Sequence, residues 1–254
     1  MSVSFDPREY EPAADELSGR IIAITGASSG IGRAVAMDCA AHGASVILIG
    51  RNAGKLEAVH SQIEARGAPE PTIALLDLEK ALAADYDQLA SAVVERFGRL
   101  DGLLHNAGIL GTLSPIEHHD VPTWCRVLHV NVTAAFALTQ VLLPALRRSP
   151  DASILFTSSS VGRHGRAYWG AYAVSKFATE GLVQVLAAEL ENTSSVRVNA
   201  VNPGKARTMM RRQAYPAEDL NSLPPPETLT GPYIALLGPG SRGVTGMSFD
   251  CQRD

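Results

Sequence analysis

The sequence carries a phenol and an ammonium group four residues apart, at Tyr172 and Lys176. The segment 172–190 has a helical pattern, and side chains four residues apart lie on the same face of a helix. A phenol with its ordinary pKa of about 10 is a poor acid or base at neutral pH, but a nearby cation favours the phenolate and lowers that pKa. The pair therefore fits proton transfer to or from an oxygen atom, which carbonyl reduction requires. Taken alone, the same spacing is also that of an ordinary pair on a helix surface.

A second segment, Thr25-Gly-Ala-Ser-Ser-Gly-Ile-Gly32, has the residue types that bind phosphates. It follows a predicted buried strand and begins a predicted helix. Gly26 permits a tight turn, Gly30 lets backbone approach a pyrophosphate, and Gly32 permits close packing of the helix. The first turn of that helix offers free N–H groups and a positive dipole end to phosphates. Glycines also serve ordinary turns, but the position between strand and helix predicts a dinucleotide site.

The residues after the second predicted strand indicate which dinucleotide is bound. An acidic residue there accepts hydrogen bonds from a ribose 2′-hydroxyl, whereas an arginine accommodates a 2′-phosphate. This chain has Gly50-Arg51-Asn52, with no acid and a cation at Arg51. Ser28 in the glycine loop adds a neutral donor. The pattern predicts NADP(H), although a solvated surface arginine would look the same in the sequence.

Short apolar runs alternate with longer helical patterns along the chain. Apolar runs without polar alternation are typical of parallel strands that are covered on both faces. Strand–helix alternation with right-handed crossovers gives a doubly wound parallel sheet. We therefore expect an α/β protein, with an N-terminal arm at 1–19 and a single Rossmann-type domain at 20–254 that has helices on both faces of its sheet. The predicted strands are 20–25, 44–50, 72–76, 102–106, 153–157 and 196–201, and the predicted helices are 31–42, 53–66, 88–97, 121–146 and 172–190.

Together, these features resemble the short-chain dehydrogenase/reductase family. The glycine loop has the family's TGxxxGIG spacing, and Tyr172 and Lys176 match its Tyr-xxx-Lys pair. Ser159 lies thirteen residues before Tyr172, as the family's substrate-orienting serine does, although a neighbouring serine could take that place. Asn131 matches the residue that helps to hold a proton-relaying water in the family. The resemblance implies the catalytic residues Asn131, Ser159, Tyr172 and Lys176.

The resemblance extends to three further motifs that follow predicted strands. They are an Asp-Leu pair beside the adenine, an Asn-Ala-Gly motif, and a Pro-Gly-x-x-x-Thr motif that holds the nicotinamide carboxamide. The residues implied to bind the cofactor are Gly26, Ser28, Ser29, Gly30, Ile31, Arg51, Asp77, Leu78, Asn106, Ala107, Gly108, Tyr172, Lys176, Pro203, Gly204, Ala206 and Thr208. No metal ligands are predicted.

Segments around the predicted site look most like the YciK-like group of bacterial oxidoreductases in this family. They are 156–163, 169–172 and 175–180, together with a histidine before the Asn-Ala-Gly motif. That group has no firmly assigned substrate, so the likeness indicates a subgroup within the family but does not identify the substrate. The family also implies a substrate lid at about 209–226 and assembly as a homodimer or homotetramer.

The composition indicates a folded chain without a nucleic-acid or membrane partner. Apolar residues make up 46% and charged residues 19%, and the formal net charge is only -4. The three cysteines are far apart and lack metal-ligand spacing, which argues against a disulfide framework. Residues 1–18 are polar and acidic, unlike a signal peptide. We therefore expect a cytoplasmic protein.

The predicted function is NADP(H)-dependent reduction of a small ketone or aldehyde to an alcohol, or the reverse, by hydride transfer with Tyr172 as acid/base. One alternative is reduction of a 3-oxoacyl group on a carrier protein, whose acidic surface would dock on cations such as Arg163, Arg166 and Arg211. An alternative of another class is a non-catalytic cofactor-sensing or scaffolding protein. The intact set of predicted catalytic residues disfavours that last alternative.

Overall fold

Seven parallel strands form one sheet in the computed structural model, which describes residues 5–253. The spatial order is β3-β2-β1-β4-β5-β6-β7, so the chain starts at the centre, builds to one edge and then crosses to the other side. This order is that of a doubly wound sheet, as predicted. The strands are β1 (Ile21–Thr25), β2 (Ser45–Gly50), β3 (Thr72–Leu75), β4 (Gly102–His105), β5 (Ser153–Thr157), β6 (Arg197–Asn202) and β7 (Ser248–Asp250).

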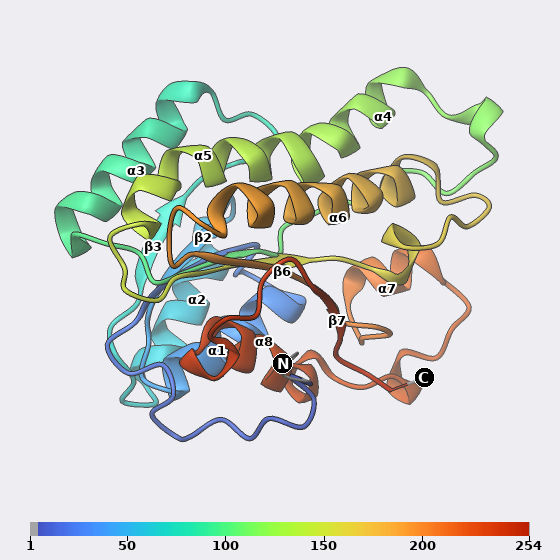
Figure 1. Cartoon of the computed structure of the whole chain (residues 1–254). Coiled ribbons are helices and arrows are strands. Elements are labelled where there is room, and N and C mark those ends of the chain that lie inside the picture. The colour runs from blue at the N-terminus through green and yellow to red at the C-terminus, as the bar shows by residue number, and fades with distance from the viewer. Residues whose placement is uncertain (1–4, 254) are drawn as a thin grey trace.

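Helices cover both faces of the sheet (Figure 1). One face carries α1 (Gly30–Ala41), α2 (Ala53–Glu64) and α8 (Gly231–Leu237). The other carries α3 (Ala83–Phe97), α4 (Val121–Leu128), α5 (Ala134–Leu146) and α6 (Gly170–Leu190). The short helix α7 (Met209–Ala214) lies beside the end of the sheet rather than on a face. Single 3₁₀ turns lie at Ile116–His118, Ser160–Gly162, Leu220–Ser222, Pro226–Leu229 and Pro239–Ser241.

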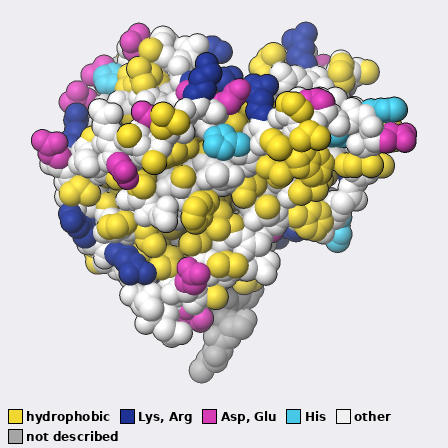
Figure 2. Space-filling model, turned by 90° about the horizontal axis from the view of Figure 1, so that it is seen from above, with side chains coloured by type: hydrophobic (Ala, Val, Ile, Leu, Met, Phe, Trp, Pro, Cys, Tyr) yellow, Lys and Arg dark blue, Asp and Glu magenta, His cyan; other side chains and the backbone are white. Residues whose placement is uncertain are grey.

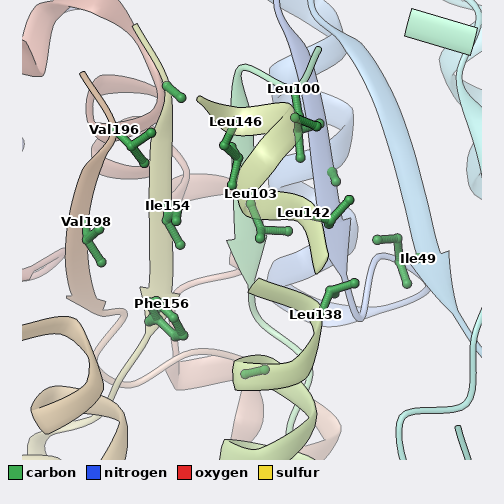
Figure 3. Close-up of a cluster of buried hydrophobic side chains, with 14 of the residues drawn as sticks. Ile49, Leu100, Leu103, Leu138, Leu142, Leu146, Ile154, Phe156, Val196 and Val198 are labelled. Atoms are coloured by element: carbon green, nitrogen blue, oxygen red, sulfur yellow. The ribbon is translucent and has the colours of Figure 1, made fainter. Parts of the chain in front are cut away.

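The larger of the two main apolar cores lies between the sheet and α5 (Figure 3). Leu142 of α5 points toward Leu103 of β4, Leu138 of α5 points toward Ile49 of β2, and Ile154 of β5 lies on the other side of Leu103. Burial of such side chains stabilises the fold by about 1.5–3 kcal/mol each. Because the central strands are apolar on both sides, they are fixed in place and can hold the loops at their ends.

The predicted helix at 121–146 is continuous, but it contains a π-helical turn at His129–Thr133. Such turns insert one residue into an α-helix and occur frequently at functional sites. The stretch Val121–Leu146 is long and apolar enough to cross a membrane by length and composition alone. Its buried residues, including Leu138 and Leu142, pack against the sheet. Core helices of soluble proteins pass the same test, so the stretch is weak evidence for a membrane span.

Three elements were not predicted from the sequence: α7, α8 and β7. The helix α8 is buried from Pro232 to Leu237 and β7 has only three residues, so neither has a periodic pattern. Part of the predicted N-terminal arm, 1–4, lies outside the described residues. The rest of the arm packs onto the domain, with Leu17 fully buried and Phe5 in edge contact with Phe249.

Candidate active site

Most of the predicted site residues gather at one edge of the sheet, because their motifs begin within two residues of the carboxyl end of a strand. The glycine loop follows β1, Arg51 follows β2, and Asp77 lies two residues beyond β3. The Asn-Ala-Gly motif follows β4, Ser159 follows β5, and the Pro-Gly-x-x-x-Thr motif follows β6. In parallel sheets all carboxyl ends lie at the same edge, which is where open α/β sheets bind their ligands.

The glycine loop has a backbone that residues with a Cβ could not adopt without strain. Gly26 and Gly30 have φ values of +68° and +54°, in the left-handed region. A Cβ on Gly32 would overlap the Gly26 carbonyl oxygen and the side-chain amide of Asn106. Ser29 is the N-cap residue of α1, and no side chain bonds the first N–H groups through that cap. The loop is therefore suited to holding phosphate at the start of α1.

The Asn-Ala-Gly motif is hydrogen-bonded to the start of the glycine loop. The Thr25 hydroxyl oxygen accepts from the backbone N–H groups of Asn106 (3.0 Å) and Ala107 (3.1 Å). The Asn106 side chain donates to the Thr25 carbonyl at 3.3 Å. These bonds join the ends of β1 and β4 into one rigid wall.

The environment of Arg51 fits a 2′-phosphate. Its side chain is 61% exposed, and it lies 3.5 Å from Glu79, which pairs more closely with Arg126 at 2.8 Å. Arg51 is therefore largely free to turn toward an anion. The Asp77 carboxylate accepts from the backbone N–H of Glu79 at 3.1 Å, and Leu78 is buried.

The loop after β6 approaches the glycine loop from the opposite side. A Cβ on Gly30 would lie 3.5 Å from the Thr208 methyl group. The Thr208 hydroxyl also accepts from Arg211 N–H and caps α7. Gln252, which the sequence did not single out, donates at 2.7 Å to the carbonyls of Pro203 and Lys205. No spacing rule would have found Gln252, because its contact depends on where the C-terminal segment folds.

The structure brings Tyr172, Ser159 and Lys176 together. Tyr172 and Lys176 are buried on one face of α6, and the Ser159 side chain lies close enough to the Tyr172 phenol to lower its pKa. The Lys176 ammonium lies 5.6 Å from the centre of the Tyr172 ring and donates to the Thr157 carbonyl at 2.7 Å. The predicted proton donor therefore has a hydroxyl beside it and a cation close to its ring.

The pKa of Tyr172 differs from the sequence expectation. Burial raises it to about 12, and the Ser159 side chain offsets this only in part. Burial also lowers the pKa of Lys176, to about 8. The lowering of the Tyr172 pKa by Lys176 that the sequence led us to expect is not seen in the chain alone, where burial has the largest effect on that pKa. At neutral pH the phenol keeps its proton, as a proton donor must.

Asn131 lies in the π-helical turn and is buried. Its side chain accepts from Ile109 N–H at 2.8 Å and donates to the Ile109 carbonyl and to Ser175 Oγ, each at 3.0 Å. It thus braces the loop after β4 against α6. A cavity of about 10 Å³ is lined by Asn131, Lys176, Thr157 and other residues, and this is near the smallest volume that holds one water.

Apolar side chains also pack around the Tyr172 ring. Leu110 and Val161 form a small cluster with Tyr172, and Trp169 and Met210 pack against it. The Trp169 ring lies 5.7 Å from the Tyr172 ring and 6.0 Å from that of Tyr215. The predicted lid segment thus contributes Met210 and Tyr215 to an apolar wall beside the phenol.

The arginines near this wall are mostly engaged within the chain. Arg163 pairs with Asp250 at 2.9 Å, and Arg211 pairs with Glu218 at 2.5 Å. Arg166 is exposed and donates to the Tyr215 hydroxyl at 2.6 Å. The interpretation of Arg163 as a cation for an anionic partner is therefore not supported, since its guanidinium is already bonded to β7.

The fold and this edge define a dinucleotide-binding α/β protein with a tyrosine–lysine pair beside the nucleotide loops. Comparison with known proteins gives the family, because the short chain dehydrogenase family profile matches residues 20–219. The chain belongs to the short-chain dehydrogenase/reductase family of oxidoreductases, as the motifs predicted.

Individual relatives agree with this assignment. An uncharacterised oxidoreductase of Escherichia coli, YciK, is 50% identical over 243 residues, which are 96% of each chain. A short chain dehydrogenase structure from Pseudomonas syringae has a TM-score of 0.95 at 53% identity, covering 96% of this chain and 99% of its own. Another, from Escherichia coli CFT073 and complexed with NADPH, has a TM-score of 0.93 at 50% identity, covering 95% and 100%. The predicted likeness to the YciK-like group is confirmed.

Proposed function

We propose that this protein reduces a ketone or aldehyde to an alcohol, or catalyses the reverse reaction, with NADP(H) as its cofactor. The observation that carries the proposal is the buried Tyr172, which keeps its proton at neutral pH and lies beside Ser159 and Lys176. NADPH supplies the hydride when it is bound at the glycine loop. The reaction converts a carbonyl compound, NADPH and a proton into an alcohol and NADP⁺.

The protein's own residues supply the proton and the orientation. The Ser159 hydroxyl donates a hydrogen bond to the substrate carbonyl oxygen and places it next to the phenol. Tyr172 then donates its proton to that oxygen as negative charge develops there. The Lys176 ammonium stabilises the resulting phenolate from its position 5.6 Å from the ring centre.

The phenol must recover its proton before the next turnover. We propose that the Lys176 ammonium returns a proton to the phenolate and is itself reprotonated from solvent through a water in the small cavity lined by Asn131, Thr157 and Lys176. Asn131 acts here by holding the wall of that cavity, because its side chain is bonded to Ile109 and Ser175.

The cofactor is held by the residues at the strand ends. The glycine loop takes the pyrophosphate, Arg51 takes the 2′-phosphate, and Thr208 with the surrounding backbone takes the nicotinamide carboxamide. The NADPH complex of the Escherichia coli relative supports the choice of NADP(H) as the cofactor. No acid stands at the end of β2 to favour a free 2′-hydroxyl.

The substrate that fits best has an apolar body around its carbonyl group. Leu110, Val161, Trp169 and Met210 give the pocket apolar walls. Carrier-protein docking loses support, because the guanidinium groups of Arg163 and Arg211 are paired with acids of this chain. Assignment to the cytoplasm stays a prediction.

We further propose that the protein is a homodimer or homotetramer. Figure 2 looks down on the face formed by α4, α5 and α6 and shows apolar side chains spread across it. Phe136, Val174, Phe177 and Val185 are each between 43% and 55% exposed there. Exposed apolar side chains on these neighbouring helices support an interaction with a second copy of the chain on this face.

Replacement of Tyr172 tests the proposal. We expect Tyr172→Phe to abolish NADPH-dependent turnover in a panel of apolar ketones and aldehydes, because the ring stays in place but the proton is lost. NADPH affinity, followed by nicotinamide fluorescence, should stay within about threefold of the wild type. Retained turnover would rule out Tyr172 as the acid, and failure of the folded wild-type protein to bind either nicotinamide cofactor would favour a scaffolding protein.

A further inference from the structure

Glu180 is a buried acid whose place in the fold the predicted site does not explain. It lies on α6 four residues after Lys176, so the two side chains are on the same face of the helix. It is only 8% exposed, although acidic side chains are almost never fully buried unless they are paired. The burial of this carboxylate one helical turn from Lys176 therefore requires a structural or electrostatic explanation.

Its carboxylate is hydrogen-bonded to the segment that carries Ser159. The Ser158 hydroxyl donates to Glu180 Oε1 at 2.5 Å, and Ser158 directly precedes Ser159 in the chain. Ser248 on β7 donates to the same oxygen at 2.8 Å. Glu180 thus joins three elements: α6, the loop after β5, and β7.

Arg163 completes this cluster. Its Nε lies 3.7 Å from Glu180 Oε1. Its other donors bond Asp250 at 2.9 Å and Ser248 at 2.7 Å. Gly162 packs so closely on α6 that a Cβ there would lie 2.9 Å from the Lys176 carbonyl oxygen. The loop from Ser158 to Arg163 is therefore clamped against the helix turn that carries Lys176.

We propose that Glu180 is a positioning residue for Ser159 and Lys176: it fixes the Ser158–Ser159 backbone against α6, and its negative charge keeps the Lys176 ammonium protonated. The role of Glu180 in catalysis rests on the proposed function, but the effect of Glu180 on the charge of Lys176 does not. That charge can be measured without any substrate.

The electrostatic part follows from burial. Removal from water lowers the pKa of Lys176, to about 8, and the Glu180 carboxylate acts in the opposite direction. The other charged groups in the cluster are Arg163 on the loop after β5, which lies 3.7 Å from Glu180, and Asp250 on β7, which pairs with Arg163 at 2.9 Å. Tyr172 on α6 is uncharged at neutral pH. Glu180 is therefore the acid available to stabilise the lysine cation.

The test is an NMR titration of Lys176 in the full-length protein. The chain has only four lysines, so ¹³Cε-lysine labelling gives few signals, and Lys176→Met assigns the one that matters. We expect Glu180→Gln, which can still accept from the serine hydroxyls, to lower the Lys176 midpoint by roughly one pH unit. Glu189→Gln, the same change at an exposed position of α6, should leave it unchanged.

Glu180→Asp provides a second, conservative comparison, because it keeps the charge but shortens the reach to Ser158. Its Lys176 midpoint should stay near the wild-type value. An unchanged midpoint in Glu180→Gln would overturn the proposal, as would equal falls in both variants.

A measurement on the wild-type protein covers the case in which Glu180→Gln does not fold. With ¹³Cδ-glutamate labelling and assigned resonances, the Glu180 signal should show a step at the pH where Lys176 titrates. Absence of that step would contradict the proposal. Both measurements stay decisive if no carbonyl substrate is ever found, so failure of the proposed function would be seen separately.

An enzymatic readout then links the charge to catalysis. Removal of a negative charge favours deprotonation of both Lys176 and Tyr172. The alkaline limb of kcat/KM for carbonyl reduction should therefore shift to lower pH in Glu180→Gln. A purely structural defect would lower the whole profile without moving that limb.

Discussion

The two halves of the binding edge are built differently. On the cofactor side, after β1 and β4, the shape comes from backbone: Gly26 and Gly30 adopt left-handed conformations, and the Thr25 hydroxyl bonds two backbone N–H groups. On the substrate side, long side chains such as Glu180 and Arg163 hold the loop that carries Ser159. Backbone shaped by glycine tolerates almost no substitution, whereas side-chain braces can be loosened one at a time.

The largest effect should come from Gly32→Ala on the cofactor side. The added Cβ would overlap the Gly26 carbonyl and the Asn106 amide, both of which belong to the wall that receives the nucleotide. We expect NADPH affinity to fall by at least 100-fold and the free energy of unfolding to fall by about 1–3 kcal/mol, the usual cost of overpacking. Fluorescence titration and urea unfolding measure the two effects.

Gly181→Ala is the matched control on α6. It is exposed within the helix, and a Cβ there would meet nothing within 4 Å. Because alanine favours helix over glycine, this variant should be more stable by up to about 1 kcal/mol and should bind NADPH normally. Equal changes in NADPH affinity and in the free energy of unfolding for the two variants would show that Gly32 has no special role in shaping the cofactor side.

The same contrast explains what the sequence predicted. A turn that needs glycine restricts the residue type at a fixed place, so the glycine loop could be recognised before the structure was known. The position of Glu180 against Ser248 depends on contacts between residues 68 positions apart, and no local pattern encodes it. The strands of the core were predicted to within a residue or two, whereas β7 is too short to show a pattern.

His105 is the last residue of β4, and it should make the free energy of unfolding depend on pH. It is buried at the end of β4, stacks on Phe156 at 4.6 Å and bonds the Thr139 hydroxyl at 2.8 Å. Burial lowers its pKa from 6.5 to about 3, so the folded chain holds it neutral. Below pH 6.5 the unfolded chain takes up a proton that the folded chain does not. This contribution to stability is present above pH 6.5 and is lost as the pH falls toward 3.

Urea unfolding at pH 7 and pH 4 measures this term. We expect His105 to account for roughly 3 kcal/mol of the fall in the free energy of unfolding between pH 7 and pH 4. His105→Leu removes the titrating group, so its loss over the same range should be smaller by about that amount. His164→Leu, at an exposed position, serves as the control and should follow the wild type.

On the cofactor side, Arg51 would contact NADPH through its side chain rather than through backbone. Replacing Arg51 should therefore lower NADPH affinity less than replacing Gly32 does. We expect Arg51→Ala to weaken NADPH binding by roughly 10- to 100-fold, because a charge-assisted hydrogen bond contributes about 1.5–3 kcal/mol. NADH binding should change little, since NADH has no 2′-phosphate. Arg96→Ala on α3 is the control, and an equal loss for both cofactors would show that Arg51 supports the loop instead.

The smallest effect is expected from Tyr215→Phe on the substrate side. The change removes the hydroxyl that accepts from Arg166 but keeps the ring beside Trp169. Because Arg166 is exposed and can bond water instead, the loss should be under about 1 kcal/mol. It should appear as a rise in KM of up to about fivefold for a carbonyl substrate, with NADPH affinity unchanged. A loss of NADPH affinity would mean that the segment holding Tyr215 also shapes the cofactor side, and the two halves could not then be separated at this point.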